Sequence, residues 1–251
     1  GSSFYRREII ARNLDTGVEK VVLSSTASLN LPIKIWNNDK LYYGVEEIKP
    51  GYDNVIDFSY GMISQIREKD LRTGKDRLVL AGEIRAYDLL PDGRILYACA
   101  TRNRFGSQLY LYQGEEGSKF LYEVPYLIDE IAAGDERIIL SAREKRTGND
   151  LYLFTLATGE LKPLVTSAHA EYGITLAGEH LFFQANYGQE YAVYCYDFRT
   201  EQISKMTTGG YAAQPAYDPD RDELYFIGLN SHGFDIYRKK ATFEEFVPPD
   251  Y

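Results

Sequence analysis

The chain has 251 residues, of which 44% are hydrophobic and 26% are charged, a composition typical of an ordinary globular domain. Its formal net charge of −9 argues against nucleic acid as a partner, because neutralising phosphates requires clustered Lys and Arg side chains. No apolar run approaches the roughly 18 residues of a membrane-spanning helix, so we expect no membrane span in this segment.

The first predicted element is a hairpin between Phe4 and Leu23, with its turn at Asp15-Thr16-Gly17. Gly1-Ser2-Ser3 look like a remnant of cloning and are left out of the fold. We expect one domain over residues 4–247, followed by a short terminal tail.

Two inner strands follow between Leu31 and Tyr43, and then comes an apolar insertion from Val45 to Gly61. Its aromatic residues include Tyr52, Phe58 and Tyr60. Solvated loops are rarely this apolar. Either the insertion extends the strands into a longer hairpin that packs on a neighbouring blade, or it forms a contact patch for a partner or an adjacent domain.

A turn that follows a Tyr- or Leu-rich strand recurs along the chain. Its copies are Asp15-Thr16-Gly17, Arg72-Thr73-Gly74, Glu115-Glu116-Gly117, Ala157-Thr158-Gly159, Arg199-Thr200-Glu201 and Ala241-Thr242-Phe243. Successive copies are 57, 43, 42, 42 and 42 residues apart, so the chain contains an internal repeat. The insertion accounts for most of the excess in the first interval.

Each repeat also carries two apolar strands joined by a tight turn. These turns are Asn37-Asn38-Asp39, Pro91-Asp92-Gly93, Gly134-Asp135-Glu136, Gly178-Glu179-His180 and Asp218-Pro219-Asp220. Gly, Asn, Asp and Pro supply the backbone dihedrals that such turns need. Four short strands in each repeat predict an all-β fold, a β-propeller of four-stranded antiparallel blades.

The number of blades depends on the first hairpin, which lacks the two inner strands that precede every later copy. The chain therefore has six outer hairpins and five inner pairs. We expect about six repeats with an incomplete first blade, whose missing strands lie upstream in a longer protein. A five-bladed ring with an extra hairpin is the alternative.

The clearest repeat begins at Tyr211 and contains Gln214-Pro-Ala-Tyr-Asp-Pro-Asp and Gly233-Phe-Asp-Ile-Tyr-Arg238. These segments resemble the repeat of TolB-like β-propellers, also called WD40-like or PD40 repeats. A second copy begins at Tyr87 and includes Pro91-Asp92-Gly93, whereas two other repeats lack this turn and match by period alone. The resemblance covers nearly the whole chain and implies a scaffold, not a particular activity.

The two cysteines, Cys99 and Cys195, occupy apolar strand positions in different blades. A disulfide needs Cα atoms within about 7 Å of each other, which blades that are not neighbours do not offer. We therefore expect two reduced thiols that behave as small buried hydrophobes.

Little in the sequence points to catalysis. The three histidines, His169, His180 and His232, fall in predicted loops and turns, and a metal site of His169, His232 and Glu171 has no fixed spacing to support it. The chain has no Gly-x-Ser-x-Gly elbow, no His-Glu-x-x-His helix and no phosphate-binding Gly-rich loop. We expect no catalytic residue, no cofactor and no metal in this domain.

The insertion and the loops that link successive blades are expected to lie at the same end of the predicted blades. Arg, Tyr and His side chains in these loops suit the binding of a peptide or of a partner's extended segment. The candidate binding residues are Tyr52, Phe58, Tyr60, Arg85, Tyr87, Arg104, Tyr126, Arg146, His169, Tyr172, Tyr211 and His232.

Three functions fit this reading. The resemblance to TolB-like propellers implies a non-catalytic binding module of a larger protein, with a protein, a peptide or an adjacent domain as its partner and the cell envelope as its favoured location. The second is an accessory or gating propeller of a multidomain peptidase. The third, a lyase acting from the propeller itself, we rank last.

Overall fold

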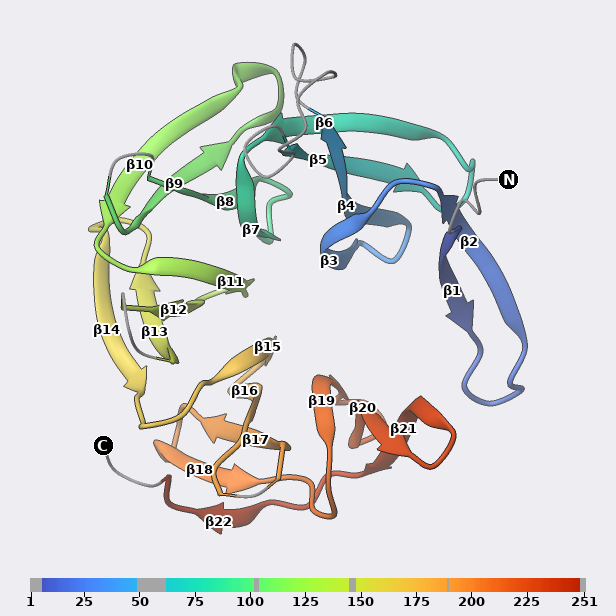
Figure 1. Cartoon of the computed structure of the whole chain (residues 1–251), viewed down its shortest axis with the longest axis vertical. Coiled ribbons are helices and arrows are strands. Elements are labelled where there is room, and N and C mark those ends of the chain that lie inside the picture. Colours follow the sequence, from blue (N-terminus) through green and yellow to red (C-terminus); the bar gives the residue numbers. More distant parts are fainter. Residues whose placement is uncertain (1–5, 49–61, 102–103, 145–147, 189, 249–251) are drawn as a thin grey trace. The chain divides into compact units, whose positions relative to one another are not determined.

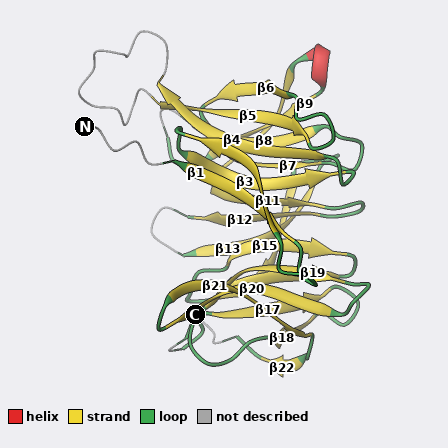
Figure 2. Cartoon of the chain, turned by 90° about the vertical axis from the view of Figure 1, so that its right-hand side faces the viewer, coloured by secondary structure: helices red, strands yellow, loops and turns green. Residues whose placement is uncertain are grey.

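The computed structural model describes residues 6–48, 62–101, 104–144, 148–188 and 190–248. Strands dominate these residues, and their only helical element is the 3-10 turn Gly114–Glu116 (Figure 2). No helix in the described part of the chain is long and apolar enough to cross a membrane. The chain divides into two compact units, residues 1–85 and residues 86–251. A single domain over residues 4–247 stays a prediction.

The first unit contains a two-stranded hairpin and one four-stranded antiparallel sheet (Figure 1). The hairpin pairs β1 (Arg7–Arg12) with β2 (Glu19–Ser25), and the sheet has the order β3 (Leu29–Trp36), β4 (Lys40–Ile48), β5 (Met62–Asp70), β6 (Asp76–Gly82). Pairing from Lys40↔Asp70 to Ile48↔Met62 shows that the start of the predicted insertion continues β4. The rest of the insertion, including Tyr52, Phe58 and Tyr60, lies outside the described residues.

The second unit contains four sheets, each with antiparallel strands in chain order. The first contains β7 (Ile84–Leu89), β8 (Ile95–Ala100), β9 (Ser107–Tyr112) and β10 (Ser118–Val124). The second contains β11 (Leu127–Ala133), β12 (Ile138–Arg143), β13 (Asn149–Thr155) and β14 (Glu160–Val165). The third contains β15 (Tyr172–Ala177), β16 (His180–Ala185), β17 (Ala192–Asp197) and β18 (Gln202–Lys205). The fourth contains β19 (Ala212–Asp218), β20 (Glu223–Asn230) and β21 (Gly233–Lys240). Strand β7 begins at the boundary between the units.

These sheets confirm the all-β propeller fold, and they match the alternative count of five blades with an extra hairpin. The predicted turns lie between the strands as expected. Asn13, Asp70 and Asp197 begin three of the outer turns, and each side chain accepts a hydrogen bond from the backbone N–H two residues later. This local bond explains why the outer turn recurs with Asx residues at its start.

The last strand departs from the predicted repeat. A strand after Ala241-Thr242-Phe243 was expected to pair with β21, but β22 (Glu244–Phe246) pairs with β18 of the preceding blade, through Ile203↔Phe246 and Lys205↔Glu244. Aromatic contacts explain the difference, because the ring of Phe246 lies 4.9 Å from that of Tyr194. The fifth blade therefore has three strands among the described residues.

The core of the second unit lies between neighbouring sheets, because strand side chains alternate between faces. Strand β9 shows this alternation, with buried Leu109 and Leu111 between half-buried neighbours. Side chains also bond across blades: Ser107 Oγ accepts the N–H of Ile128 at 2.9 Å, and Asp88 Oδ2 accepts that of Ala133 at 2.9 Å. Both bonds tie β11, the first strand of the third blade, to the second blade.

Both cysteines are free, as predicted. Cys195 is buried on β17, and burial, with a smaller contribution from the charge of Asp197, raises the pKa of its thiol to about 12. Cys99 on β8 is partly exposed. The Cys195 thiol is therefore not placed to act as a reactive thiolate.

Candidate binding face

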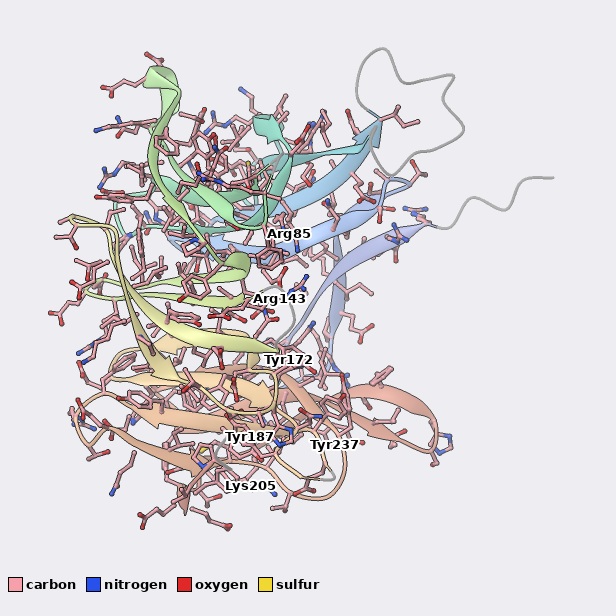
Figure 3. All side chains as sticks on the ribbon, turned by 60° about the vertical axis from the view of Figure 1, so that its left-hand side comes forward. Arg85, Arg143, Tyr172, Tyr187, Lys205 and Tyr237 are labelled. Carbon is pink, nitrogen blue, oxygen red and sulfur yellow. The ribbon has the colours of Figure 1, made fainter. Side chains whose placement is uncertain are left out.

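The loops of interest lie where the first strand of each blade begins, which we call the entry end. In the second unit these starts are Leu127, Tyr172 and Ala212, and the loops between second and third strands reach the same end because the strands alternate in direction. Figure 3 shows Arg143 and Tyr172 in this part of the second unit. Most of the predicted binding residues in the second unit lie here.

The aromatic patch of Tyr191, Tyr211 and Phe234 is the main exposed apolar feature of this end. The ring centroids of Tyr191 and Tyr211 are 5.6 Å apart, and those of Tyr211 and Phe234 are 5.5 Å apart. Tyr191 is 40% exposed and Phe234 is 67% exposed. The candidates chosen from the sequence include Tyr211 but not Tyr191 and Phe234, although both are aromatic residues that flank predicted loops.

Tyr172 lies close enough to interact electrostatically with Tyr191 and Tyr211. Burial is the main reason why its phenol pKa is raised, and the two neighbouring tyrosines add to the effect. The side chain of Gln184 bonds Tyr172, and its Oε1 accepts the N–H of Gln214 at 2.7 Å. Gln214 has φ +50, which is a strained backbone conformation for a residue with a side chain. The buried side-chain amide of Gln184 holds this backbone in place and joins the fourth blade to the fifth.

A carboxylate anchors the two loops that carry the patch. Glu190 forms an ion pair with Lys205 and accepts the N–H groups of Gly209 at 3.0 Å and Gly210 at 3.3 Å. The hydrogen bond from Lys205, followed by those two N–H groups, lowers the pKa of Glu190. The connection that ends at Tyr191 is thus fixed to the loop that ends at Tyr211.

A polar network occupies the entry end of the third blade. Arg143 Nε donates to Asp129 Oδ2 at 2.9 Å, and the side-chain amide of Asn149 donates to the same oxygen at 3.2 Å. Tyr126 packs on Tyr152 with ring centroids 4.8 Å apart. Charged and aromatic groups therefore alternate along this end, and Arg143 already has a carboxylate partner.

Beneath these loops lies Glu171, which is fully buried. Its Oε1 accepts hydrogen bonds from Ser167 Oγ at 2.5 Å and from Tyr187 Oη at 2.6 Å, whereas no described residue bonds Oε2. Burial raises the pKa of this carboxyl to about 7 despite the two hydrogen bonds, and Asp150 adds to the increase. The sequence alone suggested for Glu171 only a metal site that no fixed spacing supports.

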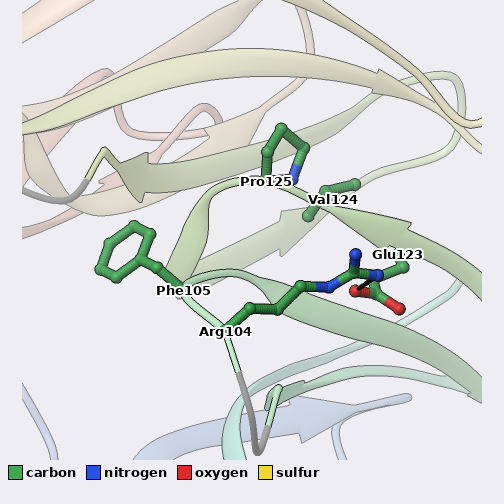
Figure 4. Close-up of a pocket in the computed structure, with 5 residues that line it drawn as sticks. All are labelled: Arg104, Phe105, Glu123, Val124 and Pro125. Carbon is green, nitrogen blue, oxygen red and sulfur yellow. Dashed lines mark ion pairs between the residues drawn. The ribbon is translucent and has the colours of Figure 1, made fainter.

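The remaining predicted residues differ in burial and in their partners. Arg85 is exposed in the first unit, whereas Tyr87 is fully buried and lines no surface. Arg104 pairs with Glu123 at the rim of a small pocket of about 200 Å³ that also contains Phe105 and Pro125 (Figure 4). Arg146 lies outside the described residues.

The histidines do not form a common site. His169 is half-buried, with its ring 5.8 Å from that of Tyr187, and His232 is exposed in the turn between β20 and β21. His180 lies at the opposite end, against Phe243. Among the described residues, no group of three His, Cys, Asp or Glu side chains is arranged to hold a metal ion.

A larger pocket, of about 600 Å³, opens at the opposite end between the second and third blades. Both of its arginines have carboxylate partners: Arg94 bonds Asp92 within the pocket, and Arg137 bonds Glu179 of the fourth blade through two guanidinium nitrogens at 3.1 and 3.0 Å. Arg137 also stacks over the ring of Phe198. These contacts brace the blades and leave the entry end as the better candidate for binding.

No family model matches the sequence, and no curated protein matches it. Solved structures do match. A putative TolB from Agrobacterium tumefaciens has a TM-score of 0.72 at 12% identity, covering 97% of this chain and 89% of that one. TolB from Acinetobacter baumannii has a TM-score of 0.68 at 17% identity, covering 98% of this chain and 64% of that one.

Peptidases are also among the matches. The acylaminoacyl peptidase of Pyrococcus horikoshii has a TM-score of 0.65 at 17% identity, covering 97% of this chain but 42% of the peptidase. The chain thus spans less than half the length of that enzyme. At these identities the likeness concerns the fold, and it confirms that this chain has a β-propeller fold similar to that of TolB and of peptidase propellers.

Proposed function

We propose that the protein is a non-catalytic binding module that holds an extended segment of a protein or peptide at the entry end of residues 86–251. The aromatic patch of Tyr191, Tyr211 and Phe234 supports this proposal most directly. Aromatic side chains bring a large contact area at a small entropic cost, and they carry much of the binding energy in protein interfaces. Tyr211 contacts both of the other rings, and Tyr191 and Phe234 are each at least 40% exposed, so the three form a preorganised apolar surface.

The surroundings of the patch favour a polypeptide over a purely apolar ligand. Leu229, 54% exposed, precedes the turn between β20 and β21, and Asn230 donates a side-chain hydrogen bond to Tyr237 Oη at 2.8 Å. Amide and phenol groups beside exposed rings provide partners for the backbone of an extended segment. The proposal gives Tyr211, Tyr172 and His232 a role at or near the contact, as the sequence reading expected.

The experiment begins with selection of binders from a phage-displayed library of random peptides, followed by calorimetric titration of a selected peptide. Substitution of Phe234 by Ser removes an exposed anchor and should weaken binding about thirtyfold or more, the effect of losing roughly 2 kcal/mol at a hot spot. The control is Phe120→Ser on β10, which removes a ring that is 50% exposed in another blade. Failure to enrich any peptide, or equal affinity of both variants and the unsubstituted protein, would reject the proposal.

A second candidate is the accessory propeller of a multidomain peptidase. The observation that favours it is the match of nearly the whole chain to part of the acylaminoacyl peptidase, together with a match to the propeller domain of the trilobed protease of Pyrococcus furiosus at a TM-score of 0.60. Sequencing the reading frame on both sides of these 251 residues tests it. A nucleophile elbow with its His and Asp partners would support this candidate, and a frame without any peptidase motif would remove it.

A further inference from the structure

The buried carboxyl of Glu171 joins two connections of the entry end. Ser167, in the loop between β14 and β15, and Tyr187, between β16 and β17, both donate to its Oε1. The backbone of Glu171 is held as well: its N–H donates to the carbonyl of Asn149 at 2.8 Å, and its carbonyl accepts from Ser141 Oγ at 2.8 Å. Glu171 is therefore a junction between the third and fourth blades.

The burial of this junction favours a neutral carboxylic acid. One carboxyl oxygen accepts two hydrogen bonds, and the other has neither a donor nor an acceptor among the described residues, so an unbonded O–H there costs less than an unbonded charge. A full negative charge on a buried carboxylate with an unpartnered oxygen is costly, because nothing replaces the water that was removed. No positive charge offsets it among the described residues, since none of their Lys, Arg or His side chains forms an ion pair with Glu171.

The titratable groups that face Glu171 strengthen this preference. Asp150 on β13 accepts the N–H of Ser167 and disfavours a second negative charge nearby. Tyr187 is the donor already named, and buried Tyr194 on β17 packs against it with ring centroids 4.7 Å apart. His169 lies on the same loop as Glu171, with its ring against that of Tyr187. Burial places the carboxyl pKa at about 7, within the physiological range.

We propose that Glu171 is a proton-dependent lock on the binding face, closed when its carboxyl is neutral and loosened when it ionises. Ionisation places a negative charge in a buried site without a cation. The carboxylate is stabilised by hydration if the loop carrying Ser167 and His169 moves to admit water. That loop leads directly into Tyr172, and the connection held by Tyr187 leads to Tyr191 of the aromatic patch. The inference rests on the proposed function, because it concerns regulation of that same face.

The test measures the affinity of a selected peptide from pH 6 to pH 8.5. The affinity of the unsubstituted protein should fall about tenfold across this range, with a midpoint near pH 7. A tenfold fall corresponds to a difference of one pKa unit in Glu171 between the peptide-bound and the free protein. Glu171→Gln, which keeps the shape but cannot ionise, should bind with a flat profile. Two controls should keep the dependence: His169→Gln, which removes the nearby imidazole, and Glu136→Gln, which removes an exposed carboxylate at the opposite end.

Infrared spectroscopy of the unsubstituted protein provides a readout that needs neither the variant nor the peptide. At pH 6 ordinary Asp and Glu side chains are ionised, so a protonated carboxyl band that disappears as the pH rises through 7 reports Glu171. Absence of this band at pH 6, or an unchanged pH profile in Glu171→Gln, would overturn the lock. Peptide binding that is constant with pH would reject the lock alone, whereas absence of binding at every pH would reject the proposed function.

Discussion

At the scale of single residues, nearly all of the buried polar side-chain atoms in the second unit have a hydrogen-bond partner. Glu171 and Tyr194 carry the two buried side-chain oxygens that find no hydrogen-bond partner among the described residues. Both belong to the fourth blade, near Tyr187, so the unsatisfied groups are concentrated beneath the binding face. Unsatisfied buried groups are uncommon in folded proteins and mark places where stability is exchanged for another property.

The folding stability should depend on pH through Glu171. Its folded pKa of about 7 exceeds the ordinary value of 4.5, so the neutral form is favoured in the folded state and the protein loses stability as the pH rises between these values. The expected loss is about 3 kcal/mol, and it should level off above pH 7. Urea denaturation at pH 5 and pH 8 measures it. Glu171→Gln should reduce this difference, and a variant that keeps the full difference would assign it to other groups.

The two thiols should differ in reactivity. Cys195 is buried with its pKa raised to about 12, whereas Cys99 is partly exposed. Because the thiolate is the reactive form, iodoacetamide should modify Cys99 in the native protein well before Cys195. Mass spectrometry after labelling without reductant should show two modified thiols in denaturant. A protein that gains no label in denaturant would instead contain a disulfide.

At the scale of elements, the repeated turns share one backbone conformation but differ in the residues that pack around them. Gly17 and Gly159 occupy the same position of the repeated turn, with φ +71 and φ +75. A Cβ atom at Gly17 would meet nothing within 4 Å, whereas one at Gly159 would lie 2.4 Å from the ring of Tyr122. The turn requires glycine at position 17 only for its left-handed backbone. At position 159 the absence of a Cβ atom also leaves space for the ring of Tyr122.

Substitution of these two glycines by alanine separates the two effects. Gly17→Ala should cost about 1 kcal/mol, the penalty of a left-handed backbone for a residue with a Cβ atom. Gly159→Ala should cost about 1 to 3 kcal/mol more, because the Tyr122 ring must move. Thermal unfolding of both variants measures the difference. Equal melting temperatures would mean that Tyr122 repacks freely.

The strand β22 should contribute measurable stability despite its three residues. Phe246 is half-buried, and its ring stacks on that of Tyr187 and packs at a tilt against that of Tyr194, with ring centroids 5.4 and 4.9 Å away. Phe246→Ala should therefore cost about 2 kcal/mol, less than the loss expected for a fully buried ring. Val247→Ala is the control, because Val247 is 80% exposed. A denaturation midpoint unchanged by Phe246→Ala would show that β22 does not remain on β18 in solution.

At the scale of the whole molecule, burial is distributed unevenly between the two units. The middle strands of the second unit are almost entirely buried, as in β16 and β17, whereas β1 has five exposed residues out of six. Hydrogen exchange should therefore be slow in β16 and β17 and fast in β1 and β2, because the free energy of local opening follows buried contact. Mass spectrometry of exchanged peptides tests this. Equal protection of β1 and β17 would contradict this expectation.

The sequence by itself determined the fold class and most element boundaries of this protein, because both depend on local signals. Alternation of side chains gave the strands, Asx and Gly residues gave the turns, and the 42-residue period gave the blade. The same signals located the loops of the entry end and, in them, Tyr172 and Tyr211.

Only the tertiary structure decided which residues form the candidate site. Tyr87 and Glu171 have the same polar character as their exposed neighbours in the sequence, yet both are fully buried. Tyr191 and Phe234 meet Tyr211 from separate connections, and β22 joins β18 through aromatic contacts with residues more than 40 positions away. Burial and ring packing depend on which blades are neighbours in space, and a repeat that gives every blade the same local pattern does not encode those differences.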